Sequence, residues 1–214
     1  MNIGVFDSGR GGELMAERLR QHLPQHNYTV INDRKNVPYG SRARRDIIHP
    51  TDLAIQPLLE TSDIIVIACN TATMAGIDTL RKRYSAMRFV GTEPMIKPAA
   101  EITKTGHVTM LATPLTMRST RYASLRDKHS KNIRVDEPYT QHWASQIERH
   151  ELDDVSLTHV EASIRAGSDV IVLACTHYLA LQQRLAAEFP DVSILEPSEA
   201  ISRQIARLER ELAE

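Results

Sequence analysis

The chain is poor in the features that mark several protein classes. Only two of its 214 residues are cysteines, so a secreted scaffold held by disulfides is not expected. No stretch approaches the roughly 20 apolar residues of a membrane helix, and no basic segment leads into an apolar one at the N-terminus. The formal net charge of −1 gives no field that would hold a polyanion. We therefore expect a cytoplasmic protein that binds neither nucleic acid nor membrane.

The chain does have a regular alternation of short apolar runs with longer amphipathic stretches. Several runs are apolar at consecutive positions, which is typical of parallel strands buried on both faces. The pattern predicts an α/β fold with parallel sheets. The strands are expected at Asn2–Phe6, Tyr28–Ile31, Asp63–Ala68, Arg88–Val90, His107–Leu111, Ile133–Val135, Asp169–Ala174 and Val192–Leu195.

Two similar segments indicate an internal repeat. Residues 63–71 (DIIVIACNT) resemble residues 169–177 (DVIVLACTH), and their cysteines, Cys69 and Cys175, are 106 positions apart. The same offset places the first predicted strand over the fifth without a gap. A repeat of half the chain is too long for a solenoid unit, so we expect two similar α/β lobes, related by pseudo-two-fold symmetry, with the active site between them. The first lobe is assigned residues 1–92 and 195–214, with a returning helix over 197–213, and the second lobe residues 93–194.

Each repeat places one cysteine directly after a predicted strand. Ligands of open parallel sheets bind beyond the carboxyl ends of the strands, so Cys69 and Cys175 are expected to face one cleft from opposite sides. Inversion of a stereocentre by proton transfer needs one group that removes a proton from one face and another that supplies a proton to the other face. A symmetric pair of thiols can do both.

Other roles for the cysteines are open at this point. A cysteine at a strand end can be a small buried hydrophobe. Zinc binding by Cys69, Cys175 and His177 is a second alternative, but the chain has no CxxC pair, so we expect no metal. A nucleophile pair of Cys175 and His177 could serve hydrolysis, which leaves the other thiol without a role. The repeat favours proton transfer, because chance would rarely place the only two cysteines at equivalent positions.

Polar residues beside the thiols predict an anionic substrate. Asn70 and Thr71 follow one cysteine, and Thr176 and His177 follow the other. Each pair is expected to open a helix whose free N–H groups attract a carboxylate. The first predicted strand ends at Asp7, which is a candidate to relay a proton or to cap the next helix. The glycine-rich turn that follows lacks the GxGxxG spacing of dinucleotide sites, so no nucleotide cofactor is expected.

Six motifs stand out along the chain. They are residues 4–12 (GVFDSGRGG), 38–40 (PYG), 68–73 (ACNTAT), 91–99 (GTEPMIKPA), 112–116 (ATPLT) and 174–178 (ACTHY). Together, and in this order, they resemble glutamate racemases of the cofactor-independent aspartate/glutamate racemase superfamily. The resemblance runs from residue 3 to about residue 205. It implies inversion at the α-carbon of glutamate without a cofactor or metal, and a role in supplying D-glutamate for the cell wall.

The resemblance also implies roles by position. Cys69 would take the proton from D-glutamate with help from Asp7. Cys175 would take it from L-glutamate with help from His177, and Glu148 best matches a further catalytic glutamate. The substrate would be held by Ser8, Pro38, Tyr39, Gly40, Asn70, Thr71, Thr113, Thr116 and Thr176. We expect a homodimer whose partner molecule is a small acidic amino acid.

Two charged residues depart from the family pattern near the glycine-rich turn. Arg10 and Glu13 stand where the family usually has apolar residues. A cation at the edge of the pocket would either contact a substrate carboxylate or project into solvent. Strict specificity for glutamate is therefore open, and aspartate or another amino acid is an alternative substrate. A catalytically silent module that binds an amino acid is an alternative function.

Overall fold

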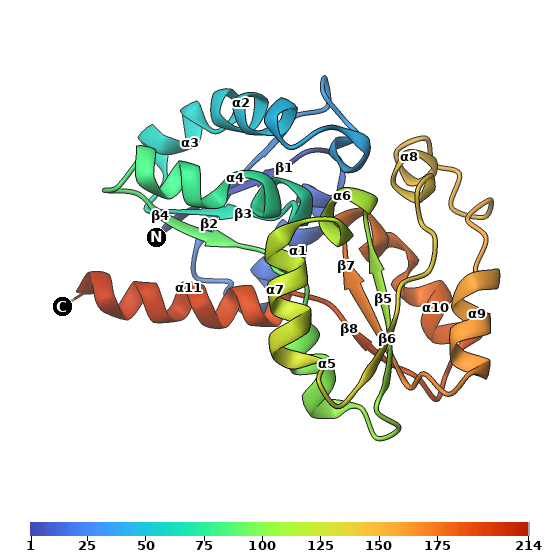
Figure 1. Ribbon diagram of the computed structural model, residues 1–214. Helices are drawn as coiled ribbons and strands as arrows, with labels where there is room; N and C mark the ends of the chain where they lie inside the picture. Colours follow the sequence, from blue (N-terminus) through green and yellow to red (C-terminus); the bar gives the residue numbers. More distant parts are fainter. Residues whose placement is uncertain (214) are drawn as a thin grey trace.

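The computed structural model describes residues 1–213 and folds them into two lobes, each built on a four-stranded parallel sheet (Figure 1). The strand order is β2–β1–β3–β4 in the first sheet and β6–β5–β7–β8 in the second. The strands are β1 (Asn2–Asp7), β2 (Asn27–Asn32), β3 (Ile64–Ile67), β4 (Arg88–Gly91), β5 (His107–Ala112), β6 (Arg134–Asp136), β7 (Val170–Ala174) and β8 (Ser193–Leu195). This arrangement confirms the predicted α/β class and the two similar lobes.

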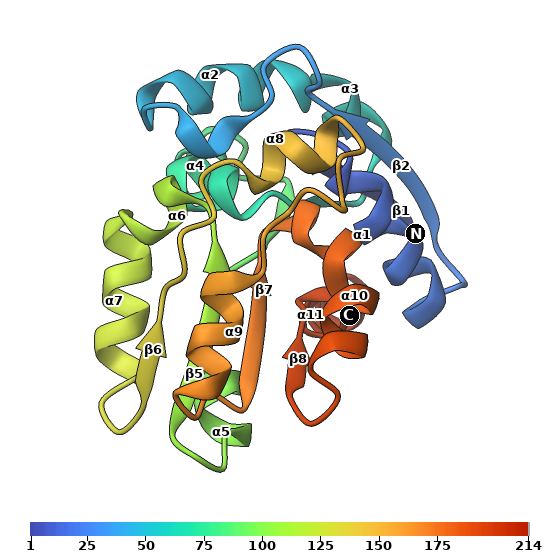
Figure 2. The same cartoon turned by 90° about the vertical axis from the view of Figure 1, so that its right-hand side faces the viewer.

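Helices cover both faces of each sheet. In the second lobe α5 and α7 lie on one side of the strands and α9 and α10 on the other (Figures 1 and 2). The helices are α1 (Gly11–His22), α2 (Arg45–Ala54), α3 (Gln56–Thr61), α4 (Asn70–Arg83), α5 (Ile96–Ile102), α6 (Pro114–Met117), α7 (Thr120–His129), α8 (Trp143–Glu148), α9 (Thr158–Arg165), α10 (Gln182–Glu188) and α11 (Ser198–Ala213). Two short 3-10 helices are η1 (Tyr39–Ser41) and η2 (Thr176–Leu181).

All eight predicted strands are confirmed to within one residue at each end. The central strands β3 and β7 are buried at every position. Their runs of valine, isoleucine and leucine form strands because β-branched side chains pack well on a pleated surface that is covered on both faces. The carboxyl ends of these two strands carry the cysteines toward the junction of the lobes.

The repeat holds for strand order but not for register. Ile3 pairs with Ile64 in the first sheet, and the 106-residue offset would pair Thr109 with Val170 in the second. Instead Val108 pairs with Val170, a shift of one residue. The prediction of an ungapped repeat is wrong in this detail. Since β5 is buried along its whole length, a slip of one position exposes no apolar side chain, and the polarity pattern does not fix the register.

The largest hydrophobic cluster is shared between the lobes. It joins residues of the first sheet, such as Ile3, to residues of the second lobe, such as Leu173 and Tyr178. The C-terminal helix α11 packs against α1 and β4, which supports its assignment to the first lobe. The exact lobe boundaries after residues 92 and 194 stay a proposal, and β8 extends to Leu195.

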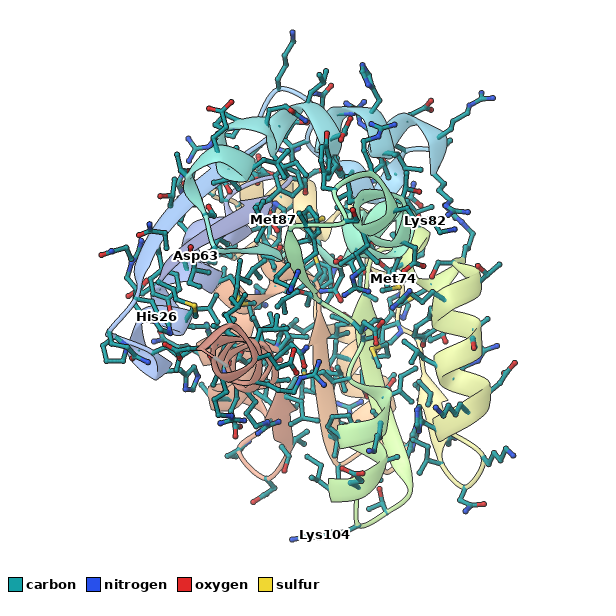
Figure 3. All side chains as sticks on the ribbon, turned by 90° about the vertical axis from the view of Figure 1, so that its left-hand side faces the viewer. His26, Asp63, Met74, Lys82, Met87 and Lys104 are labelled. Carbon is teal, nitrogen blue, oxygen red and sulfur yellow. The ribbon has the colours of Figure 1, made fainter. Side chains whose placement is uncertain are left out.

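Charged side chains cover the outside of the molecule. Lys82 and Lys104 are exposed and project away from the ribbon (Figure 3). Within residues 1–213, no helix is both long enough and apolar enough to cross a bilayer.

Candidate active site

Both cysteines line one small cavity at the junction of the two lobes. Cys69 follows β3 and Cys175 follows β7, and both side chains are buried. The space left between its walls is only about 10 Å³, roughly what one water molecule needs, so the two lobes are closely apposed around the thiols. Its walls are Ser8, Pro38, Tyr39, Gly40, Cys69, Asn70, Thr71, Thr113, Ala144, Cys175, Thr176 and His177.

The two thiols are held by different local structures. Cys69 is the N-cap of α4, and its Sγ accepts a hydrogen bond from the Ala72 N–H at 3.4 Å. Cys175 precedes η2, so the helix predicted to begin at Thr176 is present, but it is a short 3-10 helix rather than an α-helix. Only the first thiol therefore stands at the N-terminus of a long helix, and the symmetry of the repeat ends at this point.

The surroundings of Cys69 favour the protonated thiol. Burial raises the pKa of Cys69 to about 12, and the negative charge of Asp7 adds to the rise. Hydrogen bonds to the sulfur, including one with Ser8 Oγ at 3.4 Å, offset only part of it. At neutral pH this thiol is ready to give a proton rather than to take one.

Cys175 instead stands at the end of a chain of ionisable groups. Its Sγ lies 3.8 Å from Nδ1 of His177, and Nε2 of the same ring lies 2.5 Å from Oε1 of Glu148. Burial lowers the pKa of His177, but the hydrogen bonds to Cys175 and Glu148 outweigh it and raise the value to about 10. The ring is therefore a cation at neutral pH, and it can stabilise negative charge on the adjacent sulfur.

Glu148 is held in its charged form by these contacts. Burial raises the pKa of Glu148, but hydrogen bonds from His177 and from the Arg10 backbone N–H, at 2.7 Å, lower it below its ordinary value. The predicted glutamate thus lies behind the imidazole and does not line the cavity. Its position is that of a group that orients the histidine.

Asp7 lies behind the cavity wall and links the lobes. Its carboxylate accepts hydrogen bonds from the Gly9 N–H at 2.9 Å and from Thr176 Oγ1 at 2.7 Å. Burial raises the pKa of Asp7 to about 6, although the positive charge on His177 opposes the rise. The carboxyl is fully buried, and it acts on Cys69 through its charge.

Polar groups in the wall are arranged to hold a charged ligand. Thr71 Oγ1 and Thr113 Oγ1, from opposite lobes, lie 2.9 Å apart. Both polar atoms of the Asn70 side chain are buried without a hydrogen-bond partner. An unpaired buried amide costs about 1–3 kcal/mol, so this side chain is free to bind a ligand that enters the cavity. Thr116 does not line the cavity but lies behind Thr113, from which its hydroxyl accepts a hydrogen bond at 3.0 Å.

The segment from Pro38 to Gly40 closes one side of the cavity. Tyr39 is buried and donates its hydroxyl to Asp33 Oδ2 at 2.6 Å. A β-carbon at Gly40 would lie 2.7 Å from Cβ of Thr113, so glycine allows this loop of the first lobe to approach the second lobe closely. Eleven of the predicted residues, all those just described as cavity walls except Ala144, are brought together here.

One wall residue was missed by the sequence analysis. Ala144 lies on α8, one helical turn before Glu148. Residues four positions apart share a helix face, so the choice of Glu148 implied that Ala144 also faces the site. Its small side chain carried no chemical signal of its own.

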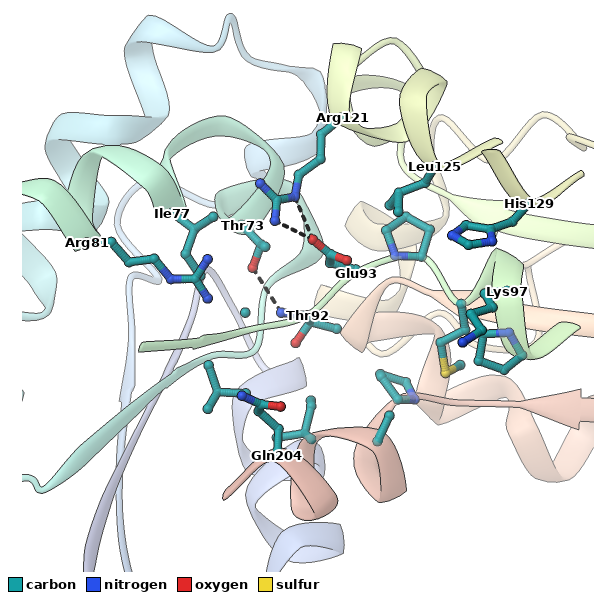
Figure 4. Close-up of a pocket in the computed structure, with 18 residues that line it drawn as sticks. Thr73, Ile77, Arg81, Thr92, Glu93, Lys97, Arg121, Leu125, His129 and Gln204 are labelled. Carbon is teal, nitrogen blue, oxygen red and sulfur yellow. Dashed lines mark hydrogen bonds and ion pairs between the residues drawn. The ribbon is translucent and has the colours of Figure 1, made fainter. Parts of the chain in front are cut away.

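Of the two alternatives for Arg10, the structure favours a side chain at the exposed surface over one that contacts a ligand in the cavity. Arg10 does not line the cavity, and Nη1 of its guanidinium contacts Nε2 of the exposed His150 imidazole. A larger hollow lies elsewhere, between β4, α7 and α11, where Arg121 pairs with Glu93 (Figure 4). It contains none of the predicted site residues.

Comparisons with known proteins agree with this geometry. Residues 13–205 match the family model described as Asp/Glu/Hydantoin racemase. A glutamate racemase of Ectopseudomonas mendocina is 36% identical over 96% of this chain and 81% of its own length. One from Herpetosiphon aurantiacus is 38% identical over 96% of this chain and 84% of its own.

A solved structure gives the same result for the fold. The Escherichia coli glutamate racemase, in complex with L-glutamate and the activator UDP-MurNAc-Ala, matches with a TM-score of 0.85 and 28% identity. The match covers 97% of this chain and 81% of that chain. From the buried thiols, the paired sheets and these matches, we conclude that this chain belongs to the Asp/Glu/Hydantoin racemase family.

Proposed function

We propose that this chain interconverts L- and D-glutamate by proton transfer at the α-carbon between two cysteines, without a cofactor. The observation that carries the proposal is that Cys69 and Cys175, from different lobes, line one small polar cavity. The names of the relatives support glutamate as the substrate. The resemblance of the six sequence motifs to glutamate racemases supports the two-cysteine route.

The reaction from L- to D-glutamate would begin at Cys175. Its thiolate removes the α-proton, the electron pair stays on the substrate as a carbanion, and the Cys69 thiol delivers a proton to the opposite face. The reverse reaction starts from the opposite protonation states. The charges described above favour the first arrangement in the free protein, because His177 is cationic beside Cys175 and the pKa of Cys69 is raised.

The difficult step is the removal of a weakly acidic proton beside a carboxylate. Hydrogen bonds from Asn70, Thr71 and Thr113, and the first N–H groups of α4, would stabilise the negative charge that develops on that carboxylate. The enclosed cavity would keep water from competing for them. We assign these residues to substrate binding, together with Ser8, Pro38, Tyr39, Gly40 and Thr176, and place Thr116 in a supporting position.

The test is incubation of the purified protein with L-glutamate in deuterated water. We expect loss of the α-proton signal by NMR and a decline of the optical signal to zero as the racemate forms. Cys69→Ser and Cys175→Ser should each abolish racemisation in both directions. If wild-type protein exchanges no proton of glutamate, the proposed substrate is wrong.

The same assay separates the alternatives. Exchange of aspartate or another amino acid, without exchange of glutamate, would reassign the substrate. Binding of glutamate by calorimetry without any exchange would favour a silent module. Arg10, which motivated that module, lies outside the cavity and so no longer argues for it.

The homodimer and the cytoplasmic location also belong to the proposal. Sedimentation velocity should give a single species of twice the chain mass. A monomer at micromolar concentration would overturn the dimer and leave the proposed reaction intact.

A further inference from the structure

A contact between the lobes lies directly behind the proposed base. Arg10, in the turn between β1 and α1, belongs to the first lobe, and its guanidinium lies against the ring of His150. His150 follows the C-terminal end of α8, two residues after Glu148. Arg10 and His150 therefore connect the first lobe to the helix that carries the catalytic-site glutamate.

The backbone of His150 is strained at this point. Its φ of 63° is in the left-handed region, and it is the only residue other than glycine with positive φ among residues 1–213. Glycine usually occupies such a position after a helix, because a β-carbon is sterically unfavourable in the left-handed conformation. Strain of this kind persists where surrounding contacts hold it, and the contact with Arg10 is one of them.

The backbone of Arg10 contacts the glutamate itself. Its N–H donates to Oε1 of Glu148 at 2.7 Å, and the same oxygen lies 2.5 Å from Nε2 of His177. The preceding residue, Gly9, packs so closely that an added β-carbon would overlap Glu148 Oε1 and lie 2.7 Å from His177 Nε2. Small shifts of this turn relative to α8 would therefore change the geometry of the histidine–glutamate pair.

The C-terminal end of α8 is exposed on one side, at Arg149 and His150. An open surface pocket of about 260 Å³ adjoins it, with walls that include Arg10, Leu14, Ile147, His150 and His177. Ile147 packs in the hydrophobic core, but the exposed side chain of His150 lacks the close packing that fixes buried side chains. Arg10 and His150 both lie in the wall of this pocket, and the contact between them restrains the His150 side chain.

We propose that Arg10 and His150 form a clasp between the lobes that positions Glu148 against His177, and through it the base Cys175. Both are positioning residues, since neither lines the catalytic cavity. The inference rests on the proposed function for its kinetic consequences. Its structural consequence, a change in the titration midpoint of the His177 ring, can be measured without any turnover.

The first test follows the titration of the His177 ring by NMR in the free protein. Arg10→Leu removes the guanidinium and keeps the backbone N–H. We expect the titration midpoint of His177 to move down by roughly one pH unit, because without the contact to His150 the end of α8 can shift and Glu148 is held beside the ring by the backbone N–H of residue 10 alone. Cys175 and Asp7, the other charged groups that act on this histidine, are unchanged in the variant.

The matched control is Arg34→Leu. Arg34 lines the same surface pocket, but it pairs with Glu13 of its own lobe at 3.0 Å. The control should leave the His177 midpoint where it is in the wild type. An unchanged midpoint in Arg10→Leu, or an equal shift in both variants, would overturn the clasp whether or not the protein racemises glutamate.

The second test is a double-mutant cycle on kcat/KM. His150→Asn removes the ring and retains a residue that tolerates positive φ, so it tests the same contact from the other lobe if Arg10→Leu folds poorly. We expect each variant to lose about tenfold, with Arg34→Leu within about twofold of wild type. The double variant should be no slower than the slower single variant, because one contact is lost in all three. Additive losses would contradict the clasp.

Discussion

Replacement of Asp7 by asparagine should stabilise the protein while it damages the site. Asp7 is completely buried, and burial raises its pKa from an ordinary 3.8 to about 6. The free-energy equivalent is about 1.4 kcal/mol for each tenfold change in proton affinity, so the charged carboxylate destabilises the fold by about 3 kcal/mol. Because the folded state holds this proton more tightly than the unfolded state, stability falls as pH rises from 3.8 through 6, and the full cost is present above that range.

The assay is urea unfolding of wild type and Asp7→Asn between pH 3.5 and 8, followed by circular dichroism. The neutral amide can still accept the Gly9 N–H hydrogen bond. We expect little difference in unfolding free energy at the acidic end and an advantage for the variant of up to about 3 kcal/mol at pH 7.5, with unchanged denaturant dependence. Racemase activity should fall in the same variant, as is common when a strained active site is relieved. A variant that is less stable at pH 7.5, or a difference independent of pH, would refute the reasoning.

Three further predictions concern the same site. Gly9→Ala should reduce kcat strongly, since the new β-carbon overlaps Glu148 and approaches His177; activity near the wild-type level in steady-state kinetics would contradict the packing. Glu148→Gln should move the alkaline limb of the kcat/KM profile from near pH 10 to lower pH, because this carboxylate helps to raise the pKa of His177; an unmoved limb would exclude that role. Asn70→Ala should raise the unfolding free energy or leave it unchanged, and should weaken glutamate binding measured by calorimetry by about tenfold, because its amide has no partner in the free protein.

Much of the fold could be predicted because the strands carry a strong local signal. The runs that became β3 and β7 are apolar at every position and bounded by polar residues, which few other structures accommodate. Because each cysteine directly follows one of these strands, the predicted strand ends also predicted the positions of the two thiols. The register of the second sheet could not be predicted in the same way, because both faces of β5 are buried and the pattern does not distinguish neighbouring registers.

The supporting parts of the site were less predictable for a different reason. Thr116 faces Thr113 rather than the cavity, and Arg10 contacts His150 rather than the ligand space. Such contacts join residues far apart in sequence, or depend on small rotations of a short helix. A local pattern of polar and apolar residues predicts neither contacts between distant residues nor the rotation of a short helix. The sequence therefore predicted the residues that take part in the chemistry, while the residues that contact and support them were known only from the structure.

The central claim is that two thiols from opposing lobes flank one carbon atom of a single substrate. A crystal structure of the protein with bound D-glutamate tests it most directly. We expect the α-carbon to lie between the sulfur atoms of Cys69 and Cys175, with each sulfur on a different face at roughly 3–4 Å, which is the range of a near-attack geometry. Glutamate bound with only one sulfur near its α-carbon, or bound outside this cavity, would contradict the account.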